Sequence, residues 1–409
     1  MEIHGFVAWR PLSEVAHAIA SVPYDTVNRA EAKALAEGNP QSFLYVVRPE
    51  INLPDSVDTY DPRVYEEATA AMERLLADGD LVVDSDRAVY LYRLQMGSHV
   101  QRGIVACCNA QDYRDGLILR HEKTRQDKED DRTRHVRAVG ANTGPVFLTY
   151  RDDPTIDQLV GAVEATEPLY SLTAPDGVLH SIWKISDAGP IVAAFKAVER
   201  FYIADGHHRA AAAVRAAEEL QREQPGPVAD EASRFLSVLF PAGQLQVLGY
   251  HRVVKDLHGM SAEEFLDALQ QVFAVTPREG AFDPPERGRA GMYLAGQWYE
   301  LAWEPPVDQG PVAALDVSVL QDRVLNPLLD IQDPRTSNRI SFVGGIRGTA
   351  ALEKEVDAGR AGVAFVMCPV SVEEVMTIAE AGREMPPKST WFEPKLRSGL
   401  LIHPFAPEC

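Results

Sequence analysis

The sequence is poor in cysteine, and its few cysteines form no recognisable motif. Its 409 residues include cysteines only at positions 107, 108, 368 and 409, without a CxxC pair or the spacing of a disulfide framework. This distribution is typical of proteins in a reducing compartment. Cys107 and Cys108 lie in an apolar run without a clear histidine or aspartate partner, so we interpret them as core residues and not as nucleophiles.

Long hydrophobic runs and an excess of basic charge are also missing. The longest apolar stretches include Ala361–Val370, which suits a buried strand and not a bilayer span of about 20 residues. The start of the chain has no basic segment followed by an apolar one, so no secretory signal is expected. With 40 Lys and Arg against 60 Asp and Glu, the net charge is -20, which repels nucleic-acid backbones and anionic lipids. We therefore expect a cytoplasmic protein that binds neither nucleic acid nor membranes.

What is present is the alternation of short strands and amphipathic helices of a mixed α/β protein. A hydrophobic content of 45% and a charged content of 24% are ordinary for a chain with a sizeable core. Apolar runs such as Pro145–Tyr150 and Ser233–Phe240 predict strands. The stretch after Asp61-Pro62 has helical periodicity and ends before Gly79, which predicts a capped helix.

The pattern divides the chain near residue 245. Pro241-Ala242-Gly243 interrupts the alternation, which restarts with a capping box formed by Ser261 and Glu264. We predict a core over residues 1–245 and a second α/β lobe over residues 246–409. The sequence leaves open whether the chain forms a homo-oligomer.

The most informative stretch begins at Phe201, where an apolar strand turns through Asp-Gly into an alanine-rich helix. Three basic side chains fall in the first helical turn, although cations are unfavourable at the positive end of the helix dipole. A bound anion would reverse that cost, because free helix N–H groups and a guanidinium both bind phosphate. A carboxylate just before them could hold a Mg²⁺ ion that bridges phosphate oxygens. The residues concerned are Asp205, Gly206, His207, His208 and Arg209.

A simpler interpretation of this stretch is that Asp205 caps the helix and that the histidines are ordinary surface groups. We favour the anion site, because capping aspartates are common whereas Asp-Gly-His-His-Arg after a strand is not. A zinc site is not expected from the spacing. Adjacent histidines in one helical turn point about 100° apart, and two histidines four residues apart with a glutamate are absent.

A second charged segment, His121-Glu122-Lys123-Thr124-Arg125, begins a run of mixed charge that continues to Arg137. One interpretation is a solvated helix supported by ion pairs between residues four apart. The other is a mobile basic loop that closes on a polyphosphate. Taken alone, the residues favour the solvated helix.

A third candidate lies near the end of the chain, in Met385–Leu396. Its Lys388-Ser389-Thr390 is similar to the end of a P-loop, but the glycines that such a loop requires are missing, so we reject that motif. Rigid prolines around these groups and Lys395 could deliver phosphate-binding side chains to a cleft. A packed C-terminal tail fits the composition equally well.

Asp25 is a fourth candidate, because it follows Val22-Pro23-Tyr24 directly after an apolar stretch. Pro23 restricts the backbone before this carboxylate to an extended or turn geometry. The simpler interpretation of Asp25 is a turn residue or the cap of a helix that runs through Ala36.

Five segments, taken in order, resemble a known family over nearly the whole chain. The Asp-Gly-His-His-Arg turn resembles that of the ParB/sulfiredoxin-like superfamily, and the full set resembles the free serine kinases and a long family related to them. The resemblance implies a ParB/sulfiredoxin-like core that binds phosphate at a helix N-terminus. Sulfiredoxins carry a cysteine in this turn and ParB proteins a basic DNA-binding region, and this chain has neither. The segments are Val22–Asp25, Asn39–Phe43, His121–Thr124, Ala204–Arg209 and Met385–Leu396.

This resemblance implies an enzyme that transfers a phosphoryl group to the hydroxyl of free L-serine, giving O-phospho-L-serine. The long form is most similar to pyrophosphate-dependent members, and ADP and ATP are the other donors of the family. It implies Mg²⁺ at Asp205 and the transferred phosphate on His207, His208 and Arg209. Asp25 is the expected base, with Glu122 as the alternative. The residues expected to bind the donor are Gly206, His121, Glu122, Lys123, Thr124, Arg125, Lys388, Ser389, Thr390 and Lys395.

Two other functions remain compatible with the same residues. A non-catalytic sensor of nucleotides or phosphometabolites would need the anion site but no turnover. A phosphoserine hydrolase would use the site in the opposite direction.

Overall fold

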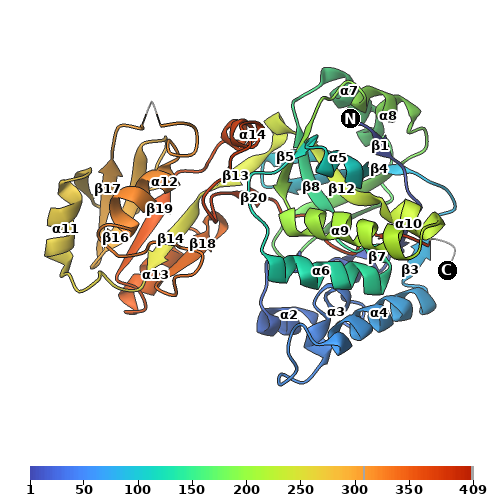
Figure 1. The fold of residues 1–409 in the computed structure, drawn as a ribbon, viewed down its shortest axis with the longest axis horizontal. Coiled ribbons are helices and arrows are strands. Elements are labelled where there is room, and N and C mark those ends of the chain that lie inside the picture. The colour runs from blue at the N-terminus through green and yellow to red at the C-terminus, as the bar shows by residue number, and fades with distance from the viewer. Residues whose placement is uncertain (307–308, 407–409) are drawn as a thin grey trace. The chain divides into compact units, whose positions relative to one another are not determined.

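The computed structural model describes residues 1–306 and 309–406, and the chain divides into two compact units (Figure 1). The first unit comprises Met1–Leu245 together with Pro394–Cys409, and the second comprises Gln246–Glu393. The chain therefore leaves the first unit after Leu245 and returns to it at Pro394. The predicted second lobe ran to residue 409 and thus included this returning segment, because no local pattern distinguishes it.

The first unit is built on a nine-stranded sheet with the order β6-β11-β8-β12-β5-β4-β10-β9, to which β1 adds through β5. Two pairs are parallel, β8 with β12 and β6 with β11. Small ladders join β2 to β3 and β7 to β21. The strands are β1 (Ile3–His4), β2 (Trp9–Pro11), β3 (Leu81–Val83), β4 (Val89–Met96), β5 (His99–Asn109), β6 (Ile118–Leu119), β7 (Ala141–Asn142), β8 (Val146–Tyr150), β9 (Tyr170–Thr173), β10 (Leu179–Ile185), β11 (Phe201–Asp205), β12 (Arg234–Pro241) and β21 (His403–Pro404).

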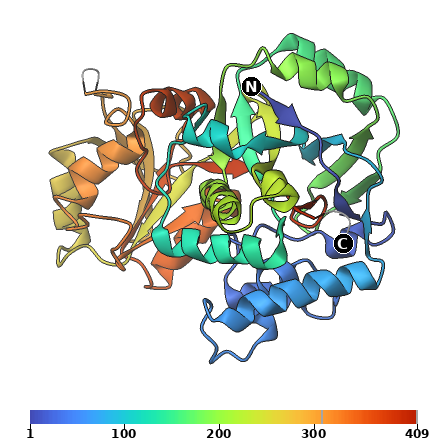
Figure 2. The ribbon, with the colours of Figure 1, turned by 45° about the vertical axis from the view of Figure 1, so that its right-hand side comes forward.

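Some helices of the first unit begin at side-chain caps that the sequence offers. In α4, Asp61 accepts the N–H of Arg63 and Pro62 occupies the first turn, as predicted. Both views of the ribbon show α9, α6 and α4 stacked side by side (Figures 1 and 2). The helices are α1 (Ala16–Ile19), α2 (Arg29–Ala36), α3 (Leu44–Val47), α4 (Pro62–Ala77), α5 (Ala110–Arg114), α6 (Gln126–Val139), α7 (Pro154–Glu164), α8 (Gly189–Phe195), α9 (His207–Glu223) and α10 (Pro227–Ala232), with 3-10 turns at Pro49–Asn52 and Ala242–Gln244.

The core of the first unit contains two large hydrophobic clusters. One joins the sheet to the helices and includes Leu148 of β8, Val214 of α9 and Ile156 of α7. The other includes Phe43 beside α3 and Met72 of α4. Each fully buried side chain of this size contributes about 1.5–3 kcal/mol of transfer free energy to folding. Because Ile203 of β11 and Ala210 of α9 belong to the first cluster, the core packing holds the end of β11 and the start of α9 in place.

The second unit contains a six-stranded antiparallel sheet with the order β15-β17-β16-β19-β14-β18, and a two-stranded ladder of β13 with β20. The predicted capping box of Ser261 and Glu264 is present at α11. The elements are β13 (Gln246–Leu248), β14 (Tyr250–Val254), α11 (Ala262–Gln270), β15 (Ala274–Arg278), β16 (Arg289–Leu294), β17 (Gln297–Ala302), α12 (Asp316–Leu320) continued by a π-helical turn (Gln321–Leu325), β18 (Ile340–Gly344), a 3-10 turn (Gly345–Arg347), α13 (Ala350–Asp357), β19 (Val363–Met367), α14 (Val372–Glu380) and β20 (Trp391–Glu393).

The structure confirms the predicted mixed α/β class and several local predictions. The apolar run Ala361–Val370 contains the fully buried strand β19. Cys107 and Cys108 lie in β5 with no exposed surface, and burial raises the pKa of the Cys108 thiol to about 12. Cys409 is outside the described residues. No helix of residues 1–306 and 309–406 combines the length and the apolar character needed to cross a bilayer.

Candidate functional site

The turn from β11 into α9 is built around Gly206. The pairing of β11 with β8 shifts register between Ile203 and Asp205, immediately before this turn. Gly206 then adopts φ 92° and ψ 32°, a left-handed conformation that side chains disfavour. A Cβ at this position would lie 2.9 Å from Nε of Arg209. Glycine is therefore required both by the backbone and by the close approach of the guanidinium.

The N-terminus of α9 has no side-chain cap. Gly206 is the N-cap residue, and no side chain accepts a hydrogen bond from the first turn of the helix. Asp205 therefore does not cap α9. Oδ1 of Asp205 instead accepts the backbone N–H of Gly206 at 2.8 Å. The first N–H groups of this 17-residue helix therefore have no side-chain acceptor. The positive end of the helix dipole is likewise not compensated by a cap.

Asp205 is held between two cations. Lys395 Nζ donates to its Oδ2 at 2.9 Å, and Nη2 of Arg209 lies 3.8 Å from its Oδ1. Burial alone would raise the pKa of Asp205, but the charges of Lys395 and Arg209 lower it below the ordinary value. The carboxylate is consequently ionised at neutral pH.

Arg209 carries a buried donor that no protein group uses. Its Nη1 donates to the carbonyl of Pro145. Its Nε is buried and has no hydrogen-bond partner among the described residues. An unsatisfied buried donor costs about 1–3 kcal/mol, and an anion at the uncapped end of α9 would remove that cost.

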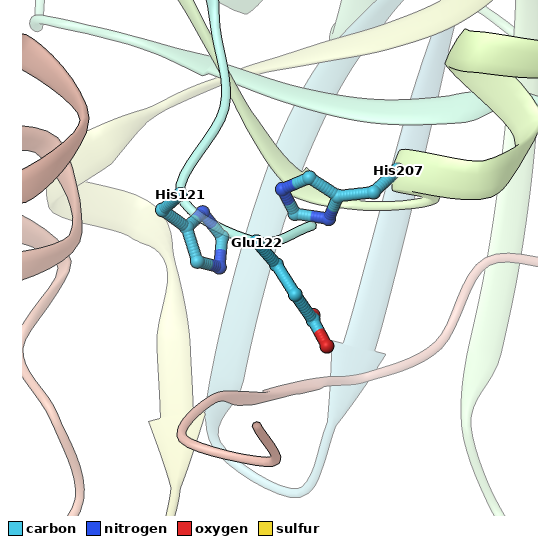
Figure 3. A group of neighbouring side chains, drawn as sticks. All are labelled: His121, Glu122 and His207. Atoms are coloured by element: carbon cyan, nitrogen blue, oxygen red, sulfur yellow. The ribbon is translucent and has the colours of Figure 1, made fainter. Parts of the chain in front are cut away.

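His121 and His207 form a pair of buried, neutral imidazoles (Figure 3). Their ring centroids are 4.5 Å apart and the rings are nearly perpendicular, at 88°. Burial lowers the pKa of His121 to about 4, and burial together with His121 lowers the pKa of His207 well below its ordinary value. At neutral pH these rings therefore offer hydrogen bonds or lone pairs, and not the positive charge that a cationic phosphate site would use.

The segment His121–Arg125 forms the loop between β6 and α6 and joins the turn at the start of α9. The backbone N–H of Arg125 donates to Nε2 of His208 at 3.0 Å. Glu122 is half-buried, and one potential ligand atom from each of Glu122, His121 and His207 lies within 4.8 Å of the others. The structure thus brings together two segments about 80 residues apart that the sequence singled out separately.

The remaining residues of this loop face outward. Lys123 and Arg125 are exposed, and Arg125 is paired with Asp127 at 2.9 Å. The hydroxyl of Thr124 donates to Glu129 at 3.1 Å. The solvated-helix interpretation of the whole run is wrong, because the helix begins only at Gln126.

Helix α6 itself is not a solvated helix. Its face toward the core buries Asp131, Arg132 and His135. Arg132 pairs with Asp131 at 2.8 Å, and the guanidinium lies 4.3 Å from the centroid of the Tyr24 ring. Charged residues are therefore structural here, because each is paired or stacked when buried.

Lys388, Ser389 and Thr390 belong to the second unit, where Lys388 Nζ lies 5.6 Å from the ring centroid of Tyr250 and Ser389 donates to the carbonyl of Pro386 at 2.6 Å. Their part in donor binding stays a prediction.

Asp25 lies in an exposed turn before α2. It does not cap that helix, because Asn28 is the N-cap and forms a capping box with Glu31. The alternative of Asp25 as a cap is therefore wrong, whereas its role as a base stays a prediction.

A small cavity of about 30 Å³ borders Arg209 on the side of Tyr24. Its polar lining includes Arg132, Asn142 and Ser398. Pro23 and Tyr24, which precede the candidate Asp25, also line this cavity. Nothing in the local sequence indicated that these residues would meet there, because Ser398 lies more than 250 positions after Arg132 and Asn142.

The first unit is thus a mixed α/β core in which a strand–glycine–helix turn has an uncapped helix end and a partly buried arginine. The neutral His207 of this turn faces the neutral His121 of the loop before α6. The chain belongs to the family described as Protein of unknown function (DUF1015), whose profile matches residues 3–318. No curated protein sequence matches the chain significantly.

Three solved structures illustrate what the chain is similar to. A variant of a free serine kinase in complex with AMP is 14% identical, with a TM-score of 0.36, and the match covers 70% of this chain and 87% of that one. A conserved hypothetical protein from Pyrococcus furiosus is 16% identical, with a TM-score of 0.34 and coverage of 70% and 90%. SbnI with a C-terminal truncation, from Staphylococcus aureus, is 12% identical, with a TM-score of 0.38 and coverage of 72% and 85%.

Proposed function

We propose that this protein is a phosphotransferase that phosphorylates the hydroxyl of free L-serine with pyrophosphate, or with ADP or ATP, as the donor. The observation that carries the proposal is the uncapped N-terminus of α9 together with the buried, unpartnered Nε of Arg209. Helix N–H groups and a guanidinium are a recurrent combination for binding phosphate. The order of the five motifs, which resembles that of the free serine kinases, supports the choice of acceptor.

Phosphoryl transfer depends on positioning and on charge stabilisation more than on covalent catalysis. Arg209 and the first N–H groups of α9 would bind the transferred phosphate and stabilise the charge on its oxygens. Lys395, paired with Asp205, lies close enough to that carboxylate to add positive potential at the same turn. His207 and His208 would act as neutral hydrogen-bonding groups that orient the phosphate, and Lys123 and Arg125 would meet the donor's distal phosphate.

Magnesium fits Asp205 poorly as a direct ligand in this arrangement. Lys395 and the N–H of Gly206 already occupy its two oxygens. Mg²⁺ prefers oxygen ligands and keeps several waters, and it commonly binds through substrate phosphates. We therefore propose that Mg²⁺ accompanies the donor as its counter-ion, where it neutralises phosphate charge, and that Asp205 positions Lys395 and the turn.

Asp25 remains our proposed base for the serine hydroxyl, with Glu122 as the alternative. Asp25 follows Tyr24, which lines the cavity beside Arg209, and this neighbourhood supports the choice of Asp25. A general base contributes about 10²–10⁴-fold to a rate when it is within reach of the proton.

The proposal is tested with a donor panel. The purified chain is incubated with Mg²⁺ and L-serine in the presence of pyrophosphate, ADP or ATP, and O-phospho-L-serine is quantified by mass spectrometry. We expect product with at least one donor, strongly reduced product in Arg209→Lys, and no product without serine. Binding of a donor without formation of O-phospho-L-serine under every condition would favour the sensor. Release of inorganic phosphate from O-phospho-L-serine, with no formation of O-phospho-L-serine from any donor, would favour the hydrolase.

A further inference from the structure

The side chains of His121, Glu122 and His207 form a cluster whose composition differs from a site for phosphate alone (Figure 3). His121 and Glu122 come from the loop before α6, and His207 is the first residue of α9. One ligand atom from each of them lies within 4.8 Å of the other two. Two imidazoles and one carboxylate are the donor set of many catalytic sites for transition metals.

The geometry points to a divalent transition-metal site, of the Zn²⁺ class, formed by His121, Glu122 and His207. Two imidazole nitrogens disfavour Mg²⁺, which takes oxygen ligands, and favour Zn²⁺ or Co²⁺. Three protein ligands would leave at least one coordination position for water or for a phosphate oxygen.

His207 supplies an independent reason to place a ligand in this cluster. Its ring is only 6% exposed, and its Nε2 is buried without a hydrogen-bond partner among the described residues. An unsatisfied buried nitrogen is costly. Coordination of a metal ion by Nε2 would use its lone pair and remove that cost.

His121 is oriented in the way that metal-binding histidines usually are. Its ring is 2% exposed, and it makes a hydrogen bond with the backbone of Ile203 in β11. A bond from one ring nitrogen to a backbone carbonyl fixes the tautomer and directs the other nitrogen toward the metal. The sheet therefore holds this ligand before any ion arrives.

The expectation against zinc rested on local spacing and considered His207 with its neighbour His208. In the structure the side chains of these two histidines contact different partners. His207 faces His121, whereas Nε2 of His208 accepts the N–H of Arg125. The partner of His207 comes from a segment that precedes it by 86 positions in the sequence, so no local motif could reveal the set.

The metal site shares residues with the proposed phosphotransfer site, but it can be tested separately because metal binding can be measured without any substrate. The full chain, freed of any affinity tag, is stripped with a chelator and titrated with Co²⁺ while the visible absorption is recorded. Zn²⁺ is then titrated against the Co²⁺ complex. We expect one equivalent per chain, absorption bands of a low-symmetry site, displacement by Zn²⁺, and no displacement by excess Mg²⁺.

Variants identify the ligands. Loss of a supporting residue near a metal typically weakens binding about 10–100-fold, so His121→Gln, His207→Gln and Glu122→Gln should each weaken it by about a hundredfold or more. His208→Gln is the matched control and should bind like the wild type. Glu122 is half-buried, so Glu122→Gln decides the question if either buried histidine variant fails to fold, as judged by circular dichroism.

Two results would overturn the inference. One is the lack of stoichiometric Co²⁺ or Zn²⁺ binding by the folded wild type. The other is binding that the folded Glu122→Gln variant leaves unchanged. A protein that lacks serine kinase activity but binds Zn²⁺ through the three residues would refute the proposed function and leave the metal site intact.

Discussion

Lys395 donates to Asp205 across 190 positions of sequence, with 2.9 Å between Nζ and Oδ2. The side chains of Lys395 and Asp205 are only 16% and 28% exposed, so the pair is largely shielded from water. Asp205 in turn accepts the N–H of Gly206, which starts the turn into α9. The returning C-terminal segment therefore supplies a cation that fixes the geometry of the candidate site.

Lys395→Met should destabilise the chain by about 1–3 kcal/mol, since it leaves a hydrogen-bonded carboxylate without its cationic partner. The pair lowers the pKa of Asp205, so its contribution is complete above the unfolded pKa of about 3.9 and is lost as the pH falls through the lower folded pKa. Urea denaturation at pH 7, 5.5 and 3.5 should show equal losses at the first two values and a smaller one at the third. Lys196→Met, on an exposed lysine, is the control; equal losses in both variants would contradict this role.

Gly206→Ala should destabilise the chain and disturb Arg209. The left-handed backbone costs about 1–2 kcal/mol for a side chain, and the new Cβ would lie 2.9 Å from Nε of Arg209. Gly161→Ala provides the opposite control, because that glycine is exposed within α7 with open space around it and alanine there should stabilise by about 0.5–1 kcal/mol. Melting temperatures of the two variants should therefore move in opposite directions, and a Gly206→Ala melt equal to wild type would show that the turn relaxes freely.

Lys123→Ala tests whether the loop before α6 meets the donor. A surface charge usually contributes 0–1 kcal/mol to stability, so the melting temperature should hardly change. Lost stabilisation of a phosphoryl-transfer transition state should cost on the order of 3 kcal/mol, about a hundredfold in kcat/KM for the donor. Steady-state rates against donor concentration measure this, with Lys33→Ala on exposed α2 as the control. Wild-type efficiency in Lys123→Ala would remove the loop from the site.

The stability of the chain should fall as the pH drops below about 6.5, and His135 should account for part of the slope. Burial, and then Arg132, lowers the pKa of His135 to about 4, whereas the unfolded value is about 6.5. The unfolded chain thus takes up the proton first, and stability present above pH 6.5 is lost as the pH falls toward 4. One such group contributes up to about 1.4 kcal/mol per pH unit.

His135→Gln keeps a side-chain donor for the carbonyl of Val46, which Nε2 contacts at 2.8 Å, but cannot titrate. Denaturant unfolding between pH 7.5 and 5 should show a slope that is shallower by about one proton than that of the wild type. His17→Gln, on an exposed residue of α1, should leave the slope unchanged. A wild-type slope in His135→Gln would mean that His135 is already protonated in the folded chain.

Local signals predicted the fold class and many of its elements. Apolar runs, the caps at Asp61 and Ser261, and the turn before α9 are short-range features, and each is found where the sequence placed it. The nature of α6 was misjudged for a physical reason. Its charges pair with residues of other elements, as Arg215 of α9 does with Asp130 at 2.5 Å, and a linear pattern does not contain such partners.

The candidate site was predictable only in its separate pieces. Asp-Gly-His-His-Arg and His121–Arg125 each stood out by composition, but their meeting depends on the parallel pairing of β6 with β11, which puts the two segments after those strands at one edge of the sheet. The pairing of His121 with His207, and the ion pair that engages Asp205, follow from that topology. We expected the metal at Asp205 because the motif around this carboxylate is contiguous in the sequence. The pair of His121 and His207 is not contiguous and is formed only by the fold.

The return of the chain at Pro394 has a consequence for synthesis on the ribosome. The backbone of Trp9 pairs with Ile402, that of Ser21 with Ser398, and β7 with β21, so the first unit is completed by residues that are translated after the whole second unit. Residues 246–393, in contrast, form one continuous segment and can fold as soon as they emerge from the exit tunnel. The first unit therefore lacks these pairings until residues 246–393 have been synthesised, and Asp205 acquires its partner Lys395 only after that point.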